Sequence, residues 1–157
     1  MITNIEIRKP TARDVRLLVQ NMRQSDMDEL KAYFSDDYDY IVKTSVKYSK
    51  DAWSVVVNGK LLFICGVGLV SLIGRVGCPW LLGTDDIAQY PKEFYKQTQK
   101  ILEEVLQDYD KLQNHVYFKN TQSLRFLKRL GFDIKDAEKY GANNEMFHPF
   151  EKVSNHV

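Results

Sequence analysis

Few side chains in this chain are suited to acid–base chemistry near neutral pH. Among the three histidines, His115 alone falls within the expected core, because His148 and His156 lie in the last strand and the tail. An imidazole titrates in the range that a general base requires. A histidine at the start of a strand with its ring half exposed needs no such role. His115 is therefore a candidate general base with a purely structural alternative.

Two further groups of side chains could bind metal or act as nucleophiles. Cys65 and Cys78 match no metal-ligand spacing and have no base nearby in the sequence, so we expect packing thiols, with a disulfide between them left open. Asp36, Asp37 and Asp39 form an acidic cluster whose simplest role is to begin a helix, where the dipole favours negative charge. A metal site is the alternative, but nothing else in the sequence supports it. We therefore predict no metal site.

Composition narrows the classes of protein to consider. The chain has 157 residues, of which 44% are apolar and 27% charged, and its net charge is +1. This length predicts one domain over residues 1–157. A balanced charge gives no general affinity for nucleic acid or anionic membranes. No apolar run approaches the roughly 20 residues of a membrane span, and no secretory signal is evident at the start.

The segment 120–132 is the most informative stretch of the sequence. Asn120 is a good helix N-cap, and Gly131 stands where a left-handed residue would end the helix. The apolar stripe predicted for this helix comprises Ser123, Phe126, Leu127 and Leu130. Strands are expected at 114–118 and 132–137. The unit is thus strand, helix, strand.

The remaining elements follow from periodicity and turn signals. Asn58-Gly59 predicts a type I′ turn in a β-hairpin, and Pro91 opens a long helix. Pro79 is expected at the beginning of its strand or at a bulge. The expected strands are 4–9, the hairpin 52–66, 78–84, 114–118, 132–137 and 145–150, and the expected helices begin near Thr11 and Ser25 and span 38–48, 91–109 and 120–130.

The motif Asn-x-x-Ser-x-x-Phe-Leu-x-x-Leu-Gly-Phe at 120–132 resembles the last conserved block of the GNAT (Gcn5-related N-acetyltransferase) fold. The order of the expected elements also matches that fold. The resemblance implies an α/β (α+β) fold, with a mixed twisted sheet of about six or seven strands flanked by helices. It also implies that the strands at 78–84 and 114–118 are adjacent and parallel, since a helix connects them.

The same resemblance implies a binding site for acetyl-CoA in the splay between those two strands. The backbone near Leu82, Gly83 and Thr84 would pair with the pantetheine arm, and Lys92 would lie near the pyrophosphate at the N-terminus of the long helix. Two further residues, Asn120 and Ser123, belong to the helix that flanks the cleft. These six residues are the candidate cofactor-binding set.

The chain departs from the GNAT pattern at two places. The phosphate loop, 85–92, has no glycine and carries Asp85 and Asp86, whose charges would repel phosphate. Leu127 stands where the family tyrosine would protonate the CoA thiolate, and it cannot donate a proton. Tyr117, Tyr140 and Tyr90 are the possible substitutes, and each has the alternative role of a core residue.

A narrower resemblance links the chain to a phage family. Several parts of the chain are similar to the small internal virion protein A family of short-tailed phages. They are segments 80–85, 91–94 and 120–132, Tyr109 followed by Leu112 and Asn114, and Tyr140-Gly141 with Phe147 and Phe150. This resemblance implies a phage or prophage origin, a location in the virion interior or the host cytoplasm, and a phage or host protein as partner. The oligomeric state does not follow from the sequence.

Two hypotheses remain from the sequence. The first is a GNAT-fold phage protein that acts mainly by binding and has lost acetyl transfer. The second is an active acetyl-CoA-dependent N-acetyltransferase with an atypical phosphate loop. The two departures and the phage resemblance favour the first.

Overall fold

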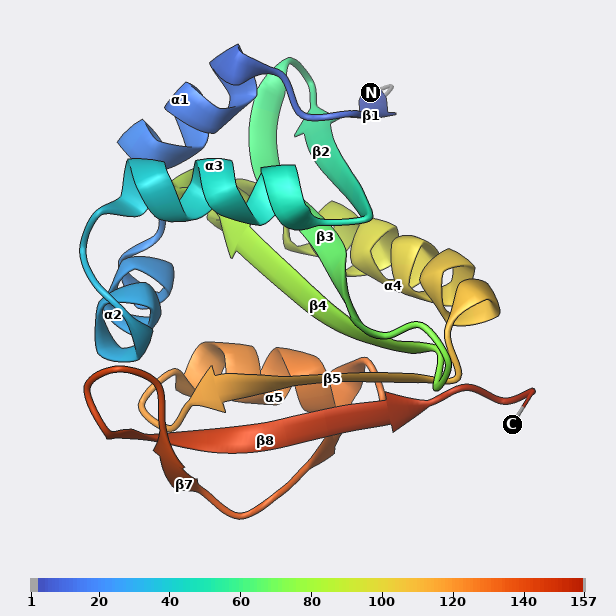
Figure 1. The fold of residues 1–157 in the computed structure, drawn as a ribbon. Coiled ribbons are helices and arrows are strands. Elements are labelled where there is room, and N and C mark those ends of the chain that lie inside the picture. Colours follow the sequence, from blue (N-terminus) through green and yellow to red (C-terminus); the bar gives the residue numbers. More distant parts are fainter. Residues whose placement is uncertain (1–2, 157) are drawn as a thin grey trace.

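A mixed sheet of eight strands runs through the molecule, and helices pack on both of its faces (Figure 1). The computed structural model describes residues 3–156. The helices are α1 (Ala12–Asn21), α2 (Gln24–Tyr33), α3 (Tyr38–Tyr48), α4 (Pro91–Asp108) and α5 (Thr121–Arg129), with a short 3-10 helix, η1 (Asp85–Gln89). The strands are β1 (Ile5–Arg8), β2 (Asp51–Val57), β3 (Lys60–Ser71), β4 (Val76–Gly83), β5 (Lys111–Tyr117), β6 (Asp133–Ile134), β7 (Glu138–Tyr140) and β8 (Glu145–Val153).

The topology confirms the fold class expected from the sequence. The strand order is β1-β2-β3-β4-β5-β8-β6, with β7 also paired to β8. All pairs are antiparallel except β4–β5, which α4 connects as a parallel crossover. The strand number differs slightly from the expected six or seven. The predicted strand at 132–137 is reduced to the two-residue β6, and β7, at 138–140, is an additional strand that was not predicted. Both pair with β8.

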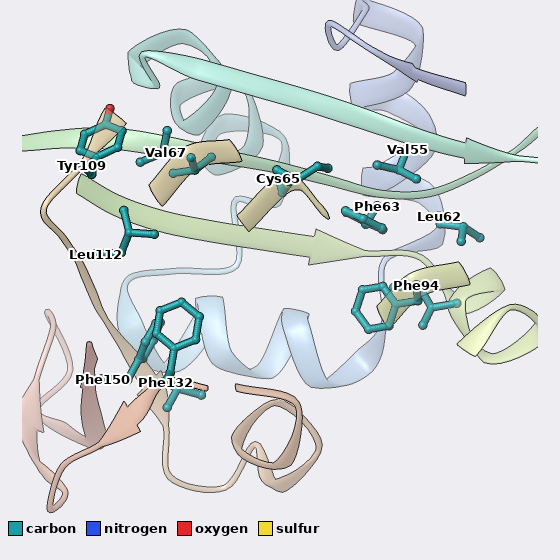
Figure 2. Close-up of a cluster of buried hydrophobic side chains, with 14 of the residues drawn as sticks. Val55, Leu62, Phe63, Cys65, Val67, Phe94, Tyr109, Leu112, Phe132 and Phe150 are labelled. Carbon is teal, nitrogen blue, oxygen red and sulfur yellow. The ribbon is translucent and has the colours of Figure 1, made fainter. Parts of the chain in front are cut away.

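The β2–β3 hairpin forms the centre of the core. Asn58 and Gly59 have φ angles of 49° and 78°, which is the geometry of the predicted type I′ turn. Residues 61–67 of β3 are all buried. Figure 2 shows the larger hydrophobic cluster, in which Phe63 of β3 meets Phe94 of α4 with ring centroids 5.3 Å apart. A second cluster packs α1 and α3 on the opposite face.

The parallel pair β4–β5 separates soon after it begins. Its only paired positions are Val76 with Lys111 and Gly77 with Leu112. The next residue of β4 that faces β5 is Pro79, which has no N–H to donate. Pro79 lies in the middle of β4, so the expectation that it begins the strand or marks a bulge is wrong. It is tolerated because its nitrogen faces the gap, where no neighbouring strand requires a donor.

Helix α5 begins and ends as predicted, but its apolar stripe is less buried than expected. Asn120 accepts a hydrogen bond from the Ser123 N–H at 3.2 Å, and Gly131 has a φ of 93°. The stripe, Ser123, Phe126, Leu127 and Leu130, is half-buried. It lines a cavity beside β4 and β5, which is why part of each side chain stays exposed.

We expect Phe126→Ala to lower the free energy of unfolding by about 2–3 kcal/mol, below the range for fully buried phenylalanine. The Phe126 ring stacks on Phe94 with centroids 4.4 Å apart, and this contact would be lost. The control Arg125→Ala, at an exposed position on the same helix, should change stability by no more than about 0.5 kcal/mol. Urea denaturation measures both, and equal losses would contradict the assignment of the stripe.

Candidate functional site

The gap between β4 and β5 opens into a cavity with a volume of about 380 Å³. Its walls come mostly from β4, β5, α2, α4 and α5, with further residues from β3, β8 and α3. The α4–α5 side is apolar and includes Ile101, Phe126 and Leu127. The α2 side carries Glu29 and a group of aromatic rings. A cavity of this size and character, with a few polar groups inside, is typical of a small-ligand site.

The pairing of β4 with β3 decides which backbone groups face the gap. Thr84 donates its N–H to the Leu62 carbonyl at 2.8 Å. The peptide groups of Thr84 and, by strand alternation, of Leu82 therefore point toward β3. The peptide groups of Pro79, Leu81 and Gly83 therefore point into the gap. Of the predicted backbone set, only Gly83 directs its polar groups toward the cavity.

Both polar groups of Gly83 are already bound by the segment that begins α2. The Gly83 N–H donates to Asp26 Oδ2 at 2.7 Å, and its carbonyl accepts from the Arg23 N–H at 2.9 Å. A Cβ at this position would lie 2.9 Å from Arg23 Nε and would clash with Ile87, so a larger residue would displace these side chains. The close approach of α2 to β4 thus closes this end of the gap.

Arg23 and Asp26 form a buried ion pair around that contact. Arg23 Nε and Nη2 donate to the two carboxylate oxygens of Asp26 at 3.0 and 3.1 Å. Burial raises the pKa of Asp26, while the charge of Arg23 and the Gly83 N–H favour the ionised form. The guanidinium also lies 5.6 Å from the Phe94 ring centroid. The pair is therefore fixed from several sides.

Along the edge of β4 that faces the gap, a side chain bridges the strands at Pro79, whereas the position at Leu81 is open. Asn114 donates its side-chain amide to the Pro79 carbonyl at 2.7 Å and accepts from the His115 N–H at 2.8 Å. This side chain replaces the missing rung of the β4–β5 ladder. Between Pro79 and Gly83, the peptide group of Leu81 has no hydrogen-bond partner within residues 3–156. Leu81 is thus the one open position on this edge of β4.

Glu29 of α2 binds the backbone of β5, as Asp26 binds the backbone of β4. Its Oε1 accepts the Tyr117 N–H at 2.7 Å and the Asn120 side-chain amide at 3.4 Å. Burial in the cavity raises the pKa of Glu29 to about 7, and the nearby Asp26 raises it further, against the effect of these hydrogen bonds. A carboxyl group that titrates near neutral pH can exchange protons with a ligand.

The predicted catalytic residues His115 and Tyr140 lie together, with Tyr33 beside them. The His115 and Tyr140 rings stack with centroids 3.5 Å apart, and Tyr140 stacks on Tyr33 at 5.4 Å. Burial lowers the pKa of His115, although Glu138 acts in the opposite direction. Burial raises the pKa of Tyr140 to about 12. At neutral pH the imidazole is neutral and the phenol keeps its proton, which suits a base and an acid respectively.

The other predicted residues are more dispersed. Tyr117 is buried against Phe147, with ring centroids 5.3 Å apart, and does not line the cavity. Tyr90 occupies the N-cap position of α4, and its hydroxyl accepts a hydrogen bond from the Asn58 side-chain amide at 3.5 Å. Ser123 lines the cavity, whereas Asn120 is buried beside Glu29. The predicted roles of these residues, and of Leu82, Gly83, Thr84 and Lys92 in cofactor binding, stay predictions.

The segment 85–92, where the pyrophosphate of CoA was expected to bind, has few groups that could bind an anion. Residues 85–89 form η1 rather than an open loop, and Asp85 is exposed there. Asp86 lies 3.9 Å from Lys60, which also donates to Gln89 at 3.2 Å. Lys92 is exposed in the first turn of α4. The local charges therefore nearly cancel and leave no concentrated positive site for a pyrophosphate.

Solved structures of acetyltransferases share this arrangement of elements. Spermidine N-acetyltransferase from Vibrio cholerae, in complex with CoA and spermine, matches with a TM-score of 0.71 at 13% identity, over 96% of this chain and 95% of that one. A GNAT-family acetyltransferase from Bacillus anthracis matches with a TM-score of 0.68 at 14% identity, over 96% and 95%. The chain has the GNAT acetyltransferase fold. Identities this low show the fold alone.

A family model gives a separate indication. The model described as bacteriophage T7 probable scaffold protein Gp13 matches residues 61–137, just under half of the chain. The matched segment includes β4, β5, α4 and α5, which form most of the cavity wall. This match agrees with the phage link suggested by the sequence. No curated protein matches the chain.

The sequence interpretation missed Arg23, Asp26 and Glu29, because a charged helix face ordinarily faces solvent.

In residues 3–156, no group of three or more His, Cys, Asp or Glu side chains is placed to hold a metal ion. Both cysteines of the chain are free, with Cys65 buried. No helix in this described part is long and apolar enough to cross a membrane.

Glu29→Gln should make stability less dependent on pH. With a pKa near 7 in the folded protein against 4.5 unfolded, the wild-type glutamate binds more protons when folded between these values. Its contribution to stability is therefore fully present below about pH 4.5 and is lost as the pH rises through 7. At pH 8 the variant should be more stable by on the order of 1–3 kcal/mol.

Urea denaturation from pH 4 to 8 measures this difference. Glu103→Gln, at an exposed position on α4, is the matched control and should follow the wild-type profile. Parallel profiles for wild type and Glu29→Gln would show that Glu29 titrates as an ordinary surface carboxylate.

Proposed function

We propose that this chain is a phage-encoded GNAT-fold protein that acts by binding a phage or host protein and has lost efficient acetyl transfer. One observation carries the proposal: the Gly83 peptide group, which faces the gap at the end where α2 approaches β4, is bound on both sides by Asp26 and Arg23. An acyl carbonyl or pantetheine amide would have to displace a charged acceptor. Hydrogen bonds to charged groups are worth about 1.5–3 kcal/mol, against roughly 0.5–1.5 for neutral ones.

Two further features support the loss of transfer. Asp85 and Asp86 precede the α4 N-terminus, where Pro91 removes a donor. Leu127 lines the cavity at the position where a tyrosine would protonate the thiolate. Each feature alone is tolerable in an enzyme. Together they weaken acyl placement, phosphate binding and leaving-group protonation at once.

The phage assignment rests on the partial family match. That family is described as a probable scaffold protein of bacteriophage T7, which suggests a role in contact with other phage proteins. We place the protein in the virion interior or the host cytoplasm on the same basis.

An active N-acetyltransferase is the second candidate function. Glu29 favours it, because a carboxyl group with a pKa of about 7 in an apolar cavity is suited to deprotonate an amine. His115 and Tyr140 lie on the same side of the cavity and could act as base and acid. The fold match to an enzyme crystallised with CoA and spermine makes acetyl-CoA a reasonable ligand to test.

Thermal unfolding with acetyl-CoA separates the two candidates. Binding to the folded state alone raises Tm by an amount set by RT ln(1+[L]/Kd). We expect no rise at millimolar acetyl-CoA and no CoA release with spermidine or lysine peptides as acceptors. The Vibrio cholerae enzyme, assayed in parallel, is the positive control. A clear rise in Tm together with CoA release would establish the enzyme instead.

Removing both acids of η1 should improve any residual CoA binding. Two carboxylates near a phosphate cost on the order of 1 kcal/mol each in water-like surroundings, so Asp85→Gly/Asp86→Gly should bind CoA at least several-fold more tightly. Titration calorimetry with CoA measures this change. Asp36→Gly/Asp37→Gly, in the loop before α3, controls for overall charge. Tight wild-type binding that the η1 variant leaves unchanged or weakens would mean that η1 binds phosphate in another way.

A further inference from the structure

The open position at Leu81 lies beside the cavity and between two filled positions. The Leu81 peptide group points into the gap, while Pro79 is bridged by Asn114 and Gly83 is bound by Asp26. Leu81 is half-buried, so an incoming chain can reach its peptide group. Unpaired N–H and C=O groups on a strand edge are available to pair with another chain. The free N–H and C=O on one residue match the pair of groups that an extended peptide presents.

We propose that the gap between β4 and β5 binds an extended peptide segment of a partner protein, which pairs with Leu81 and places a lysine or arginine against Glu29. The proposal rests on the binding function proposed above and names the chemistry of the partner. Main-chain pairing to an exposed strand edge is a common mode of peptide recognition.

The two sides of the cavity fit the two faces of an extended chain. Successive side chains of a strand point to opposite sides. The α4–α5 wall offers apolar contacts from Ile101, Phe126 and Leu127, and the α2 wall carries Glu29. A bound segment should therefore have apolar residues facing α4 and α5 and a basic residue facing α2.

Charge complementarity selects the basic residue. Apart from His115, the charged side chains that line the cavity are Arg23 and Glu29. Arg23 is paired with Asp26, whereas Glu29 has no cation within 4.0 Å in residues 3–156. An ionised carboxylate in an apolar cavity is costly without a counter-charge, and burial accordingly raises its pKa. A ligand cation would supply that counter-charge.

The charges and the bound backbone groups at the ends of the gap favour a basic peptide over CoA as the ligand. CoA carries phosphates to the α4 end, where Asp85 and Asp86 lie. A basic peptide meets no repulsion from those acids. It also needs only one open rung on β4, so the bound state of Gly83 is no obstacle.

The test is selection of a displayed library of random nine-residue peptides against the full chain and two variants. Glu29→Gln removes the charge. Leu81→Pro removes the N–H that faces the gap and leaves the β3 ladder intact, as Pro79 already does two residues earlier. Circular dichroism and thermal unfolding establish that each variant is folded. The best peptide is then synthesised with and without N-methylation at each amide, and binding is followed by Trp80 fluorescence, since Trp80 lines the cavity.

We expect enriched peptides with lysine or arginine between apolar residues. Kd should rise at least about tenfold for Glu29→Gln, for Leu81→Pro and for one N-methylated position. Should Leu81→Pro fail to fold, the N-methyl series tests the same hydrogen bond from the peptide side.

Three outcomes would overturn the proposal: no enrichment over Leu81→Pro or background, enrichment without basic residues, or a Kd unaffected by both Glu29→Gln and N-methylation. These outcomes leave the binding function itself intact. Tight acetyl-CoA binding with transfer would instead overturn the proposed function, whatever the peptides do.

Discussion

Two parallel strands that diverge leave peptide groups that must find other partners, and this constraint organises the site. β4 and β5 separate at Pro79, the residue that cannot donate. From there the protein supplies substitutes for the missing rungs. The Asn114 amide bridges the strands at the narrow end, and α2 provides acceptors at the wide end. The position of α2 against the sheet thus follows from hydrogen-bond requirements as much as from apolar packing.

The two acids of α2 meet these requirements in different ways. Asp26 and Glu29 are three residues apart, so they lie on one face of the helix and reach β4 and β5 respectively. Asp26 has a cation, Arg23, and is held in place. Glu29 has only neutral donors and lies beside another acid, which is why its pKa rises to about 7. The first acid is structural, whereas the second can respond to pH or to a ligand.

Much of the fold could be predicted from the sequence, because its signals are local. The Asn58-Gly59 turn, the Asn120 cap and the Gly131 terminus each involve neighbouring residues, and the structure has all three. The site could not be predicted in the same way. Asp26 and Glu29 bind partners 57 and 88 residues away, and their own helix gives no sign of it. The start of that helix was expected near Ser25, and α2 begins at Gln24 with Arg23 as the residue before it.

Pro79 shows how one sequence rule can fail for a physical reason. A proline in a central strand removes a ladder hydrogen bond, so it was expected at the end of the strand or at a bulge. The rule assumes partners on both sides, and β4 has a partner only on the β3 side at that position.

Hydrogen bonds already made by the edge of β4 limit which ligands the cleft can bind. Each N–H serves one strong acceptor at a time, and a carboxylate competes for it better than a neutral carbonyl does. Displacing Asp26 from Gly83 would in addition disturb the buried Arg23 pair, and breaking such a pair is strongly unfavourable. The wide end of the gap therefore stays closed to acyl groups while Leu81 stays open. A GNAT cleft altered in this way keeps its shape and its apolar wall, but its remaining capacity for main-chain pairing lies in the middle of the gap rather than where acyl transfer would take place.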